Sequence, residues 1–317
     1  MSVTYTHSDC LQNSYKINWR IRDVLGDEHF DKNRHWLPQR LSGAGSIPFL
    51  TEREKACLTH VEMGAYAHLF GYVEEFIAPE ILSLAKGYEI EEREAFDALA
   101  NFAAEEVKHM TLFREIRDRV DETLGFRLRL LEGEKEVART VLSKNRGAVL
   151  LLTAVIEWFT QLHYLSAFKD DETLDPLTKK IFKAHWQEES QHARMDHIET
   201  LRTFSNMSEA DKEQAIADLI VLVGAVDELL KKQAQYDLEN LEQYLNRTFT
   251  TAERRAILQS VLRAKRFAFI ESGVTHPNFK ATFVEVTNAV QRDRVGNAIA
   301  TVLQEQAAAV PQEQAAA

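Results

Sequence analysis

The stretch GAVLLLTAVIEWFTQL, residues Gly147 to Leu162, is apolar on every side of a helix for three turns and then carries one carboxylate, Glu157. Its longest uncharged apolar run, Ala148 to Ile156, is far shorter than the roughly 20 residues that a membrane-spanning helix needs. A helix that is apolar all round belongs in a protein core, where an uncompensated carboxylate is costly. The stretch therefore predicts a buried core helix in which something compensates Glu157.

Most other long segments also have helical rather than alternating periodicity, and the 12 glycines and 6 prolines fall mainly between them. Thr51-x-x-Glu54 is a capping box, and Asp175 before Pro176 is an N-cap followed by proline at the first helical position. We therefore predict an all-α fold built on a four-helix bundle. Its helices are expected over about 51–84, 90–120, 146–168 and 176–205.

The rest of the chain is expected to surround this bundle. Residues 1–50 are interpreted as an N-terminal arm that lies on the bundle, which itself spans 51–205. Ser208 and Thr250 or Thr251 begin further helical patterns, so 206–305 is expected to hold C-terminal helices that pack on the bundle in the same domain. Residues 306–317 repeat QEQAAA and form a low-complexity tail with no predicted role.

Composition narrows the class of protein. Lys and Arg total 38 against 49 Asp and Glu, and the net charge of -11 argues against general nucleic-acid binding. The first residues lack the apolar core of a signal peptide, and no segment is expected to span a membrane. Cys10 and Cys57 form no C-x-x-C motif, so neither a zinc ribbon nor a disulfide scaffold is indicated. We expect a cytoplasmic protein.

An internal repeat accounts for the carboxylate at 157. VEEF, which contains Glu74, aligns with IEWF, which contains Glu157, at an offset of 83 positions. The same offset aligns EEVKH, residues 105–109, with EESQH, residues 188–192. In each half one Glu is thus followed 32 residues later by Glu-x-x-His. Two such patterns in register indicate a shared site.

Glu and His three residues apart project from nearly the same face of a helix, so each pair can offer an oxygen and a nitrogen to one point. Four-helix bundles hold two metal ions with one Glu from each of two helices and Glu-x-x-His from the other two. Four carboxylates also balance two divalent cations, which compensates the buried charge. The sequence predicts a dimetal site with the ligands Glu74, Glu106, His109, Glu157, Glu189 and His192.

The neighbouring carboxylates leave an alternative. Glu75, Glu105 and Glu188 could point inward instead, which would shift every ligand by one position, but helical phase places Glu74 nearer the apolar stripe than Glu75. A ligand histidine usually donates its second N–H to a carboxylate or carbonyl. We expect Glu105 and Glu188 to accept these hydrogen bonds across the repeat; the alternative is that they are surface residues.

The second half of the repeat differs from the first at position 185. Position 185 is His where its partner, position 102, is Phe. His185, Glu189 and His192 fall at i, i+4 and i+7 on one helical face, so H-x-x-x-E-x-x-H can offer three ligands to one ion. A buried core histidine is the alternative, but the phase relative to two predicted ligands favours a third histidine ligand.

This pattern of Glu, E-x-x-H, Glu and H-x-x-x-E-x-x-H resembles the non-haem diiron N-oxygenases of the p-aminobenzoate N-oxygenase family, in the ferritin-like superfamily. The resemblance covers about residues 50–205, and its third histidine is the specific part. It implies a ferritin-like bundle, two iron ions, O2 as co-substrate and an external electron donor. It also implies that one iron takes Glu74, Glu106 and His109, that the other takes Glu157, His185 and His192, and that Glu189 lies between them.

The resemblance implies an oxygenase that oxidises the nitrogen of a small aromatic or apolar amine. Two alternatives remain open: a diiron hydroxylase or desaturase that acts on C–H bonds, and a metal-binding bundle that is not an enzyme. Imidazole and carboxylate ligands also suit manganese or zinc. We expect a small-molecule substrate, an electron-donor protein or reductant, and a possible homodimer. Residues one turn from ligands that could line the substrate pocket are Phe70, Phe102, Phe113, Thr153 and Gln161.

Overall fold

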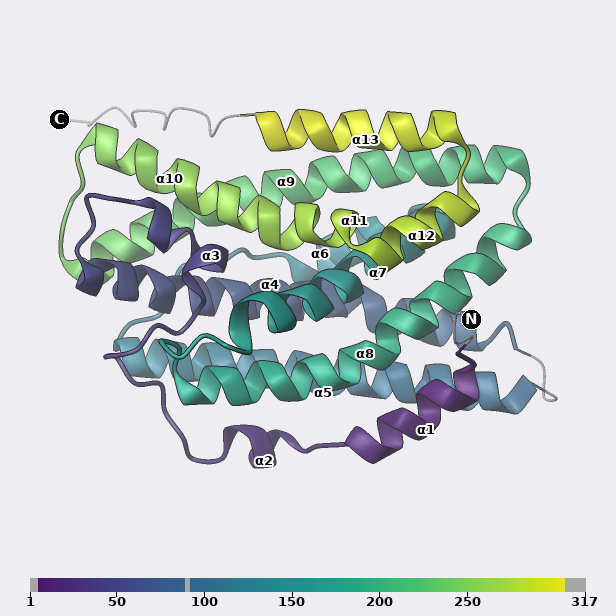
Figure 1. The fold of residues 1–317 in the computed structure, drawn as a ribbon, viewed down its shortest axis with the longest axis horizontal. Coiled ribbons are helices and arrows are strands. Elements are labelled where there is room, and N and C mark those ends of the chain that lie inside the picture. The colour runs from purple at the N-terminus through teal and green to yellow at the C-terminus, as the bar shows by residue number, and fades with distance from the viewer. Residues whose placement is uncertain (1–4, 89–91, 306–317) are drawn as a thin grey trace.

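The computed structural model describes residues 5–88 and 92–305, and in these residues the regular structure is helical, with a lone β-bridge between His35 and Leu174. The chain has the all-α fold that its helical periodicity predicts. Figure 1 shows long helices that lie side by side in layers, with the N-terminal helices α1 and α2 along one edge. The predicted tail at 306–317 lies outside the described residues.

Four helices form the bundle. They are α4 (Glu52–Ala85), α5 (Arg93–Leu124), α7 (Arg146–His163) and α8 (Pro176–Ser205). The start of α4 is fixed by the predicted capping box, because the Thr51 hydroxyl accepts from the Glu54 backbone N–H and the Glu54 carboxylate accepts from the Thr51 N–H. Asp175 caps α8 through the Leu177 N–H. The predicted start of the second helix at residue 90 lies outside the described residues, and the described helix begins at Arg93.

Helix α7 is the core helix that the opening stretch predicts. Together with the π-helical turn η3 (Tyr164–Phe168) it forms the one described helix that is long and apolar enough to cross a membrane by length and composition. However, 83% of its most apolar window is buried inside the protein. Glu157 therefore sits at the centre of the bundle and not on a lipid-facing or solvated surface.

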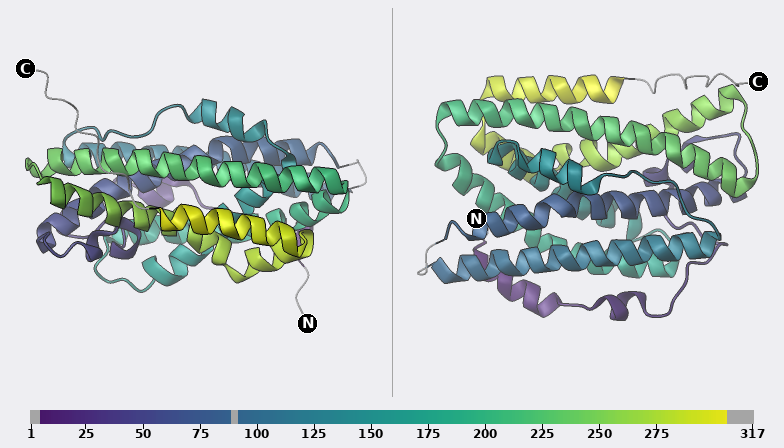
Figure 2. Two further views of the ribbon diagram at one scale, coloured as in Figure 1. Left: turned by 90° about the horizontal axis from the view of Figure 1, so that it is seen from above. Right: turned by 180° about the vertical axis from the view of Figure 1, so that it is seen from behind.

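The C-terminal part of the chain packs on the bundle. It comprises α9 (Glu209–Leu245), α10 (Thr251–Arg266), the π-turn η4 (Phe267–Glu271), α11 (Ser272–Thr275), α12 (Pro277–Val286) and α13 (Ala289–Gln304). Figure 2 shows α9 crossing the length of the molecule, with α13 along its outer side. The helical pattern that begins near Thr250 is divided into several helices, because Pro277 begins α12 and Asn288 caps α13.

Two segments hold helices that the sequence did not predict. The N-terminal arm contains α1 (His7–Ile17), α2 (Ile21–Leu25), α3 (Gln39–Ser42) and the 3-10 turn η1 (Ala44–Ser46), and α1 packs on both α5 and α8. The polar stretch between the second and third bundle helices contains α6 (Glu134–Leu142). Its few apolar residues, Val137, Ala138 and Val141, face the core, which is enough to hold one short amphipathic helix.

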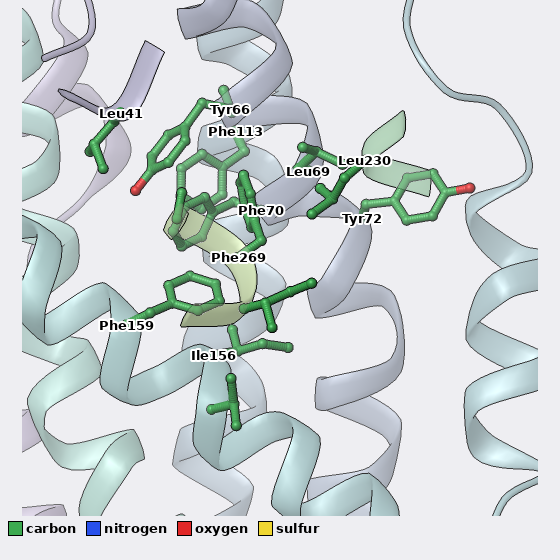
Figure 3. Close-up of a cluster of buried hydrophobic side chains, with 14 of the residues drawn as sticks. Leu41, Tyr66, Leu69, Phe70, Tyr72, Phe113, Ile156, Phe159, Leu230 and Phe269 are labelled. Carbon is green, nitrogen blue, oxygen red and sulfur yellow. The ribbon is translucent and has the colours of Figure 1, made fainter. Parts of the chain in front are cut away.

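An aromatic cluster fills the bundle beside the predicted site. Figure 3 shows Tyr66 and Phe70 of α4 close to Phe113 of α5, with Phe159 of α7 and Phe269 of η4 nearby. The Phe70 and Phe113 rings lie 5.1 Å apart between centroids, and both meet the ring of His185 edge to face. This packing fixes the position of His185 and surrounds it with apolar surface.

Candidate metal centre

The seven predicted ligands come together from all four bundle helices. Each of these residues is at most 3% exposed. Helix α4 supplies one carboxylate and α7 another, whereas α5 and α8 supply the Glu-x-x-His pairs, as the repeat predicts. Glu75, the alternative to Glu74, is partly exposed and lies at a surface groove. The residues concerned are Glu74, Glu106, His109, Glu157, His185, Glu189 and His192.

Glu189 is the centre of the cluster because its carboxylate reaches all three histidines. Its Oε1 lies 2.6 Å from His185 Nε2 and 2.9 Å from His109 Nδ1. Its Oε2 lies 2.9 Å from His192 Nδ1. A carboxylate with one oxygen toward each of two nitrogen-rich positions has the geometry of a bridging ligand.

Two groups of donor atoms are close enough to hold an ion, with all atoms of each group within 4.8 Å of one another. They share two members. The groups are Glu74, His109, His185 and Glu189, and Glu106, His109, Glu189 and His192. This grouping differs from the division that the family resemblance implies, because His185 lies with Glu74 and not with His192.

Glu157 is in neither group, but it faces the same centre. It is 2% exposed, and its Oε2 has no hydrogen-bond partner. Burial raises the pKa of the Glu157 carboxyl well above its usual range, and the nearby carboxylates of Glu189 and Glu106 raise it further. Without a metal ion this carboxyl therefore holds its proton more tightly than an ordinary glutamate does.

The outer ring nitrogen of each Glu-x-x-His histidine donates a hydrogen bond to a carboxylate of the other half. His109 Nε2 donates to Glu188 Oε2 at 2.9 Å, and His192 Nε2 donates to Glu105 Oε2 at 2.9 Å. These are the contacts across the repeat that the sequence pattern predicts. They leave Nδ1 of both histidines facing the cluster. The tautomer that offers an Nδ1 lone pair inward is thereby fixed.

The donor set fits metal ions, because many of its buried atoms lack a protein partner. Native proteins pair nearly all of their buried polar atoms, so a concentration of unpartnered ones at one point indicates a missing ligand. All are carboxylate oxygens or imidazole nitrogens, and both groups suit iron, manganese and zinc. Some of these atoms lie within 3 Å of Glu189 or His192, but none of them makes a well-aligned hydrogen bond. They are Glu74 Oε2, both oxygens of Glu106, His109 Nδ1, Glu157 Oε2 and both ring nitrogens of His185.

The crowded carboxylates and imidazoles also shift one another's proton affinities. Burial raises the pKa of Glu74 well above its usual range, and the charges of Glu106 and Glu189 add to this. Burial alone lowers the pKa of His109, but Glu189 and the other carboxylates outweigh it and raise the value to about 9. Glu74 and His109, which hold protons more tightly than usual in the absence of metal, must release them when cations bind.

The five predicted pocket residues are buried in different settings. Phe70 and Phe113 pack on His185, and Phe102 stacks on His192 at 3.9 Å between centroids. The Thr153 hydroxyl bonds to the Val149 carbonyl of its own helix, and Gln161 donates to the Trp186 carbonyl. Of these five, Phe113 lines a cavity.

Two cavities lie along the bundle helices. One is a groove of about 230 Å³ between α4, α5 and the start of α6; it has Phe113 on its wall and Arg114, Arg117 and Lys135 around it. The other, about 70 Å³, is lined by apolar side chains and Tyr72. Val73 and Ile156, which directly precede Glu74 and Glu157, form part of this apolar cavity. No predicted ligand lines either cavity.

Sequence reasoning missed two arrangements near the site. The indole of Trp19, in the N-terminal arm, stacks on His109 with 5.9 Å between ring centroids and 16° between planes. The Tyr66 hydroxyl donates to His163 Nδ1 at 2.6 Å, and His163 Nε2 donates to the Ser272 hydroxyl. Burial lowers the pKa of His163 to about 3, so this histidine is neutral. Neither arrangement has a local sequence signal, because its members are about 90 or more residues apart.

A four-helix bundle with one Glu from each of two helices and Glu-x-x-His from the other two is a dimetal carboxylate protein of the ferritin-like kind. The particular family follows from sequence comparison. The family P-aminobenzoate N-oxygenase AurF matches residues 12–273, and the chain belongs to this family. It is therefore an oxidoreductase of the N-oxygenase class, with a buried site of carboxylates and histidines for two metal ions.

Solved structures show more distant likenesses. Two are variants of the R2-like ligand-binding oxidase with a reconstituted Mn/Fe cofactor. The first is 15% identical, covers 84% of this chain and 94% of that chain, and has a TM-score of 0.43. The second is 12% identical, covers 96% of this chain and 94% of that chain, and has a TM-score of 0.41. No curated protein sequence matches the chain.

Proposed function

We propose that this protein is a non-haem diiron oxygenase that uses O2 to oxidise the nitrogen of a small, uncharged aromatic amine. The observation that carries the proposal is the convergence of buried, unpartnered carboxylate and imidazole atoms on one point between four helices. Membership of an N-oxygenase family supports the reaction type. The reaction needs a redox-active ion, which excludes zinc, and we propose iron rather than manganese because the N-oxygenases that the ligand pattern resembles use iron.

Two iron ions held here would supply the electrons that activate dioxygen for transfer of an oxygen atom to the amine. The chain's own residues prepare the site for this. Glu189 and its three histidines fix the positions of the ions, and Glu105 and Glu188 keep His192 and His109 in the required tautomer. Phe70 and Phe113 cover His185 with apolar surface, which excludes water from that side.

The apolar cavity supports an uncharged substrate. It lies against the turns of α4 and α7 that carry Glu74 and Glu157, and its lining includes Phe76, Phe159 and Phe269. It has no cationic side chain with which to hold a carboxylate. Its volume is smaller than the roughly 150 Å³ of a cavity that holds benzene, so a ring enters only when lining side chains rotate. A small aromatic amine fits this lining best.

The groove between α4 and α5 favours a second candidate substrate. Its lining has three cationic side chains, Arg114, Arg117 and Lys135, against two carboxylates, Glu75 and Glu134. Arg and Lys are the usual partners of a substrate carboxylate. Phe113 separates this groove from His185. An aromatic amine with a para carboxylate could bind there with its charged end outward and its ring toward Phe113.

A competition assay separates the two substrates. The iron-loaded, reduced protein is given O2 and an equimolar mixture of aniline and p-aminobenzoate, and the N-oxidised products are quantified. We expect the uncharged amine to be oxidised preferentially. A strong preference for p-aminobenzoate that disappears in Arg114→Leu or Arg117→Leu would contradict the apolar-cavity assignment. Oxidation of ring or alkyl carbons without N-oxidation would support the C–H hydroxylase alternative instead.

A further inference from the structure

An oxygenase of the proposed kind needs a route for electrons into its core. The seven predicted ligands are at most 3% exposed, so a donor protein cannot touch them directly. The inference below rests on the proposed function, because it assigns the position at which electrons cross from the surface to the metal ligands.

Four non-ligand rings pack against the predicted ligand histidines. Phe70 and Phe113 meet His185, Phe102 stacks on His192, and Trp19 stacks on His109. The three phenylalanines are at most 2% exposed. Among these rings of the described chain, Trp19 is the one that is partly exposed to solvent. Trp19 therefore connects the protein surface to a predicted ligand, His109, through a single ring contact.

The position of Trp19 is fixed on both sides. Its indole N–H donates to the Ala184 carbonyl of α8 at 3.0 Å. On the α5 side, the Lys108 ammonium lies 4.1 Å above the ring centre and donates to the Trp19 carbonyl at 3.3 Å. Lys108 also forms an ion pair with Glu188, the carboxylate that accepts from His109. The ring stack and this chain of polar contacts both lead from Trp19 to His109.

We propose that Trp19 is the point at which electrons pass from an external donor protein to the dimetal centre, by way of His109. In each transfer one electron leaves the donor's reduced cluster and converts one ferric ion of the oxidised centre to ferrous. Two transfers complete the reduction. No bond of Trp19 forms or breaks, and its ring returns to the neutral state in which it began.

Lys108 keeps the ring of Trp19 in its neutral state. A cation over an aromatic face stabilises the neutral ring and opposes a positive charge on it. Oxidation of Trp19 is therefore disfavoured, and the ring acts as a neutral bridge between the donor and His109, while the reduction potentials of donor and centre set the direction of transfer.

The surface around Trp19 suits an acidic donor. Lys16, Arg20 and Arg22 lie exposed on the arm beside it, and Lys183 lies exposed next to Ala184. Asp23 offsets part of this charge through contacts with Arg20 and Arg22. A local excess of cations on a chain of net charge -11 is a recognition feature for a partner with a negative face. The partner class is an acidic electron-transfer protein.

The test measures reduction of the oxidised, iron-loaded protein by a reduced acidic [2Fe–2S] ferredoxin in a stopped-flow spectrometer. We expect Trp19→Leu to lower the rate of this reduction about tenfold or more, which corresponds to a barrier increase of roughly 1.4 kcal/mol. Iron content, helicity and reduction by dithionite with a small viologen mediator should be unchanged. Trp19→Phe, which keeps a ring in the stack, should lie between Leu and the wild type.

Trp158→Leu is the matched control, because Trp158 is also partly exposed and stacks on a histidine, His276, that is not a predicted ligand. Equal ferredoxin rates in the wild type and Trp19→Leu would overturn the inference, and so would an equal slowing of ferredoxin and dithionite reduction.

The paired change Arg20→Glu and Arg22→Glu should lower the rate of reduction by ferredoxin at low salt. An unchanged rate overturns the acidic-partner assignment. A wild-type protein that binds iron but, when reduced, does not react with O2 overturns the proposed function itself.

Discussion

The two halves of the metal-bearing bundle, α4 with α5 and α7 with α8, share a framework but differ at several inward positions, one of which adds a histidine to the cluster. Position 102 in α5 is Phe, and its ring stacks on His192 of the other half. Its repeat partner in α8 is His185, whose ring meets His109 edge to face with 4.6 Å between centroids. The two rings make equivalent contacts across the repeat, but only His185 adds a nitrogen, 2.6 Å from Glu189.

This difference shows how a symmetric framework becomes an asymmetric site. The repeated residues offer the same donor types from both halves, and the exchange of Phe for His adds a third imidazole that the first half does not match. Two ions bound here would therefore have different surroundings, which would let them take different roles in oxygen chemistry. The following changes test how unequally the two halves contribute.

The largest effect is expected from the two Glu-x-x-His glutamates. Glu189 reaches three histidines and belongs to both donor groups, whereas Glu106 belongs to one. Glu189→Ala should therefore lose both ions and all activity, and Glu106→Ala should keep one ion. Iron per folded chain, measured by elemental analysis after iron loading, distinguishes them. Equal iron content in the two variants would mean that Glu189 is not shared.

Exchange of the asymmetric pair comes next. His185→Phe makes the second half like the first, and we expect it to remain folded, to bind less iron at one position and to react differently with O2. Phe102→His is the reciprocal change, and this variant should bind as much iron as the wild type does. Unchanged iron content and oxygen kinetics in His185→Phe would show that this histidine is a core residue.

The outer carboxylates should give a smaller, graded effect. Glu188→Gln and Glu105→Gln each weaken the hydrogen bond that orients a histidine, and such changes typically cost about 10- to 100-fold in metal affinity. The loss should be larger at Glu188, which is fully buried and paired with Lys108, than at Glu105, which is 7% exposed and accepts from the Ser14 hydroxyl at 3.4 Å. Competitive titration with a chelator gives both affinities. The reverse order would contradict this ranking.

The smallest effect concerns the stability of the metal-free protein. Glu157→Leu should abolish activity but raise the free energy of unfolding by roughly 1–3 kcal/mol, because it replaces a buried polar group with an apolar one. Since burial raises the pKa of Glu157 above 4.5, the wild type loses stability as pH rises through the folded-state value. The gain should thus be larger near pH 8 than near pH 5. Urea unfolding of metal-free protein at both pH values measures it; a loss of stability would show that protein groups satisfy Glu157.

The sequence predicted those parts of the structure whose causes are local or repeated. The starts of α4 and α8 follow from Thr51 and Asp175, since a cap acts within three residues of itself. The contacts of Glu105 with His192 and of Glu188 with His109 follow from the repeat, because equivalent positions in two halves face each other. The burial of Glu157 follows from the apolar helix that surrounds it.

The sequence could not predict contacts that depend on the path of the chain between elements. Trp19 reaches His109 only because the arm folds back over α5 and α8, and nothing near residue 19 encodes that path. The division of the ligands between two ions depends on rotations of α7 and α8 that a one-dimensional pattern does not fix. The sequence pattern did not predict helix α6, because tertiary packing stabilises this short segment whose composition is mostly polar.

The central claim is that this site holds two iron ions that activate O2 for transfer to an amine nitrogen. The most direct measurement gives the iron-loaded, anaerobically reduced protein ¹⁸O2 and aniline and determines the mass and structure of the product. The account predicts an N-oxygenated product that carries ¹⁸O on nitrogen, with no product from the Glu189→Ala variant. Absence of O2 consumption by protein with full iron content, or ¹⁸O found on carbon alone, would contradict it.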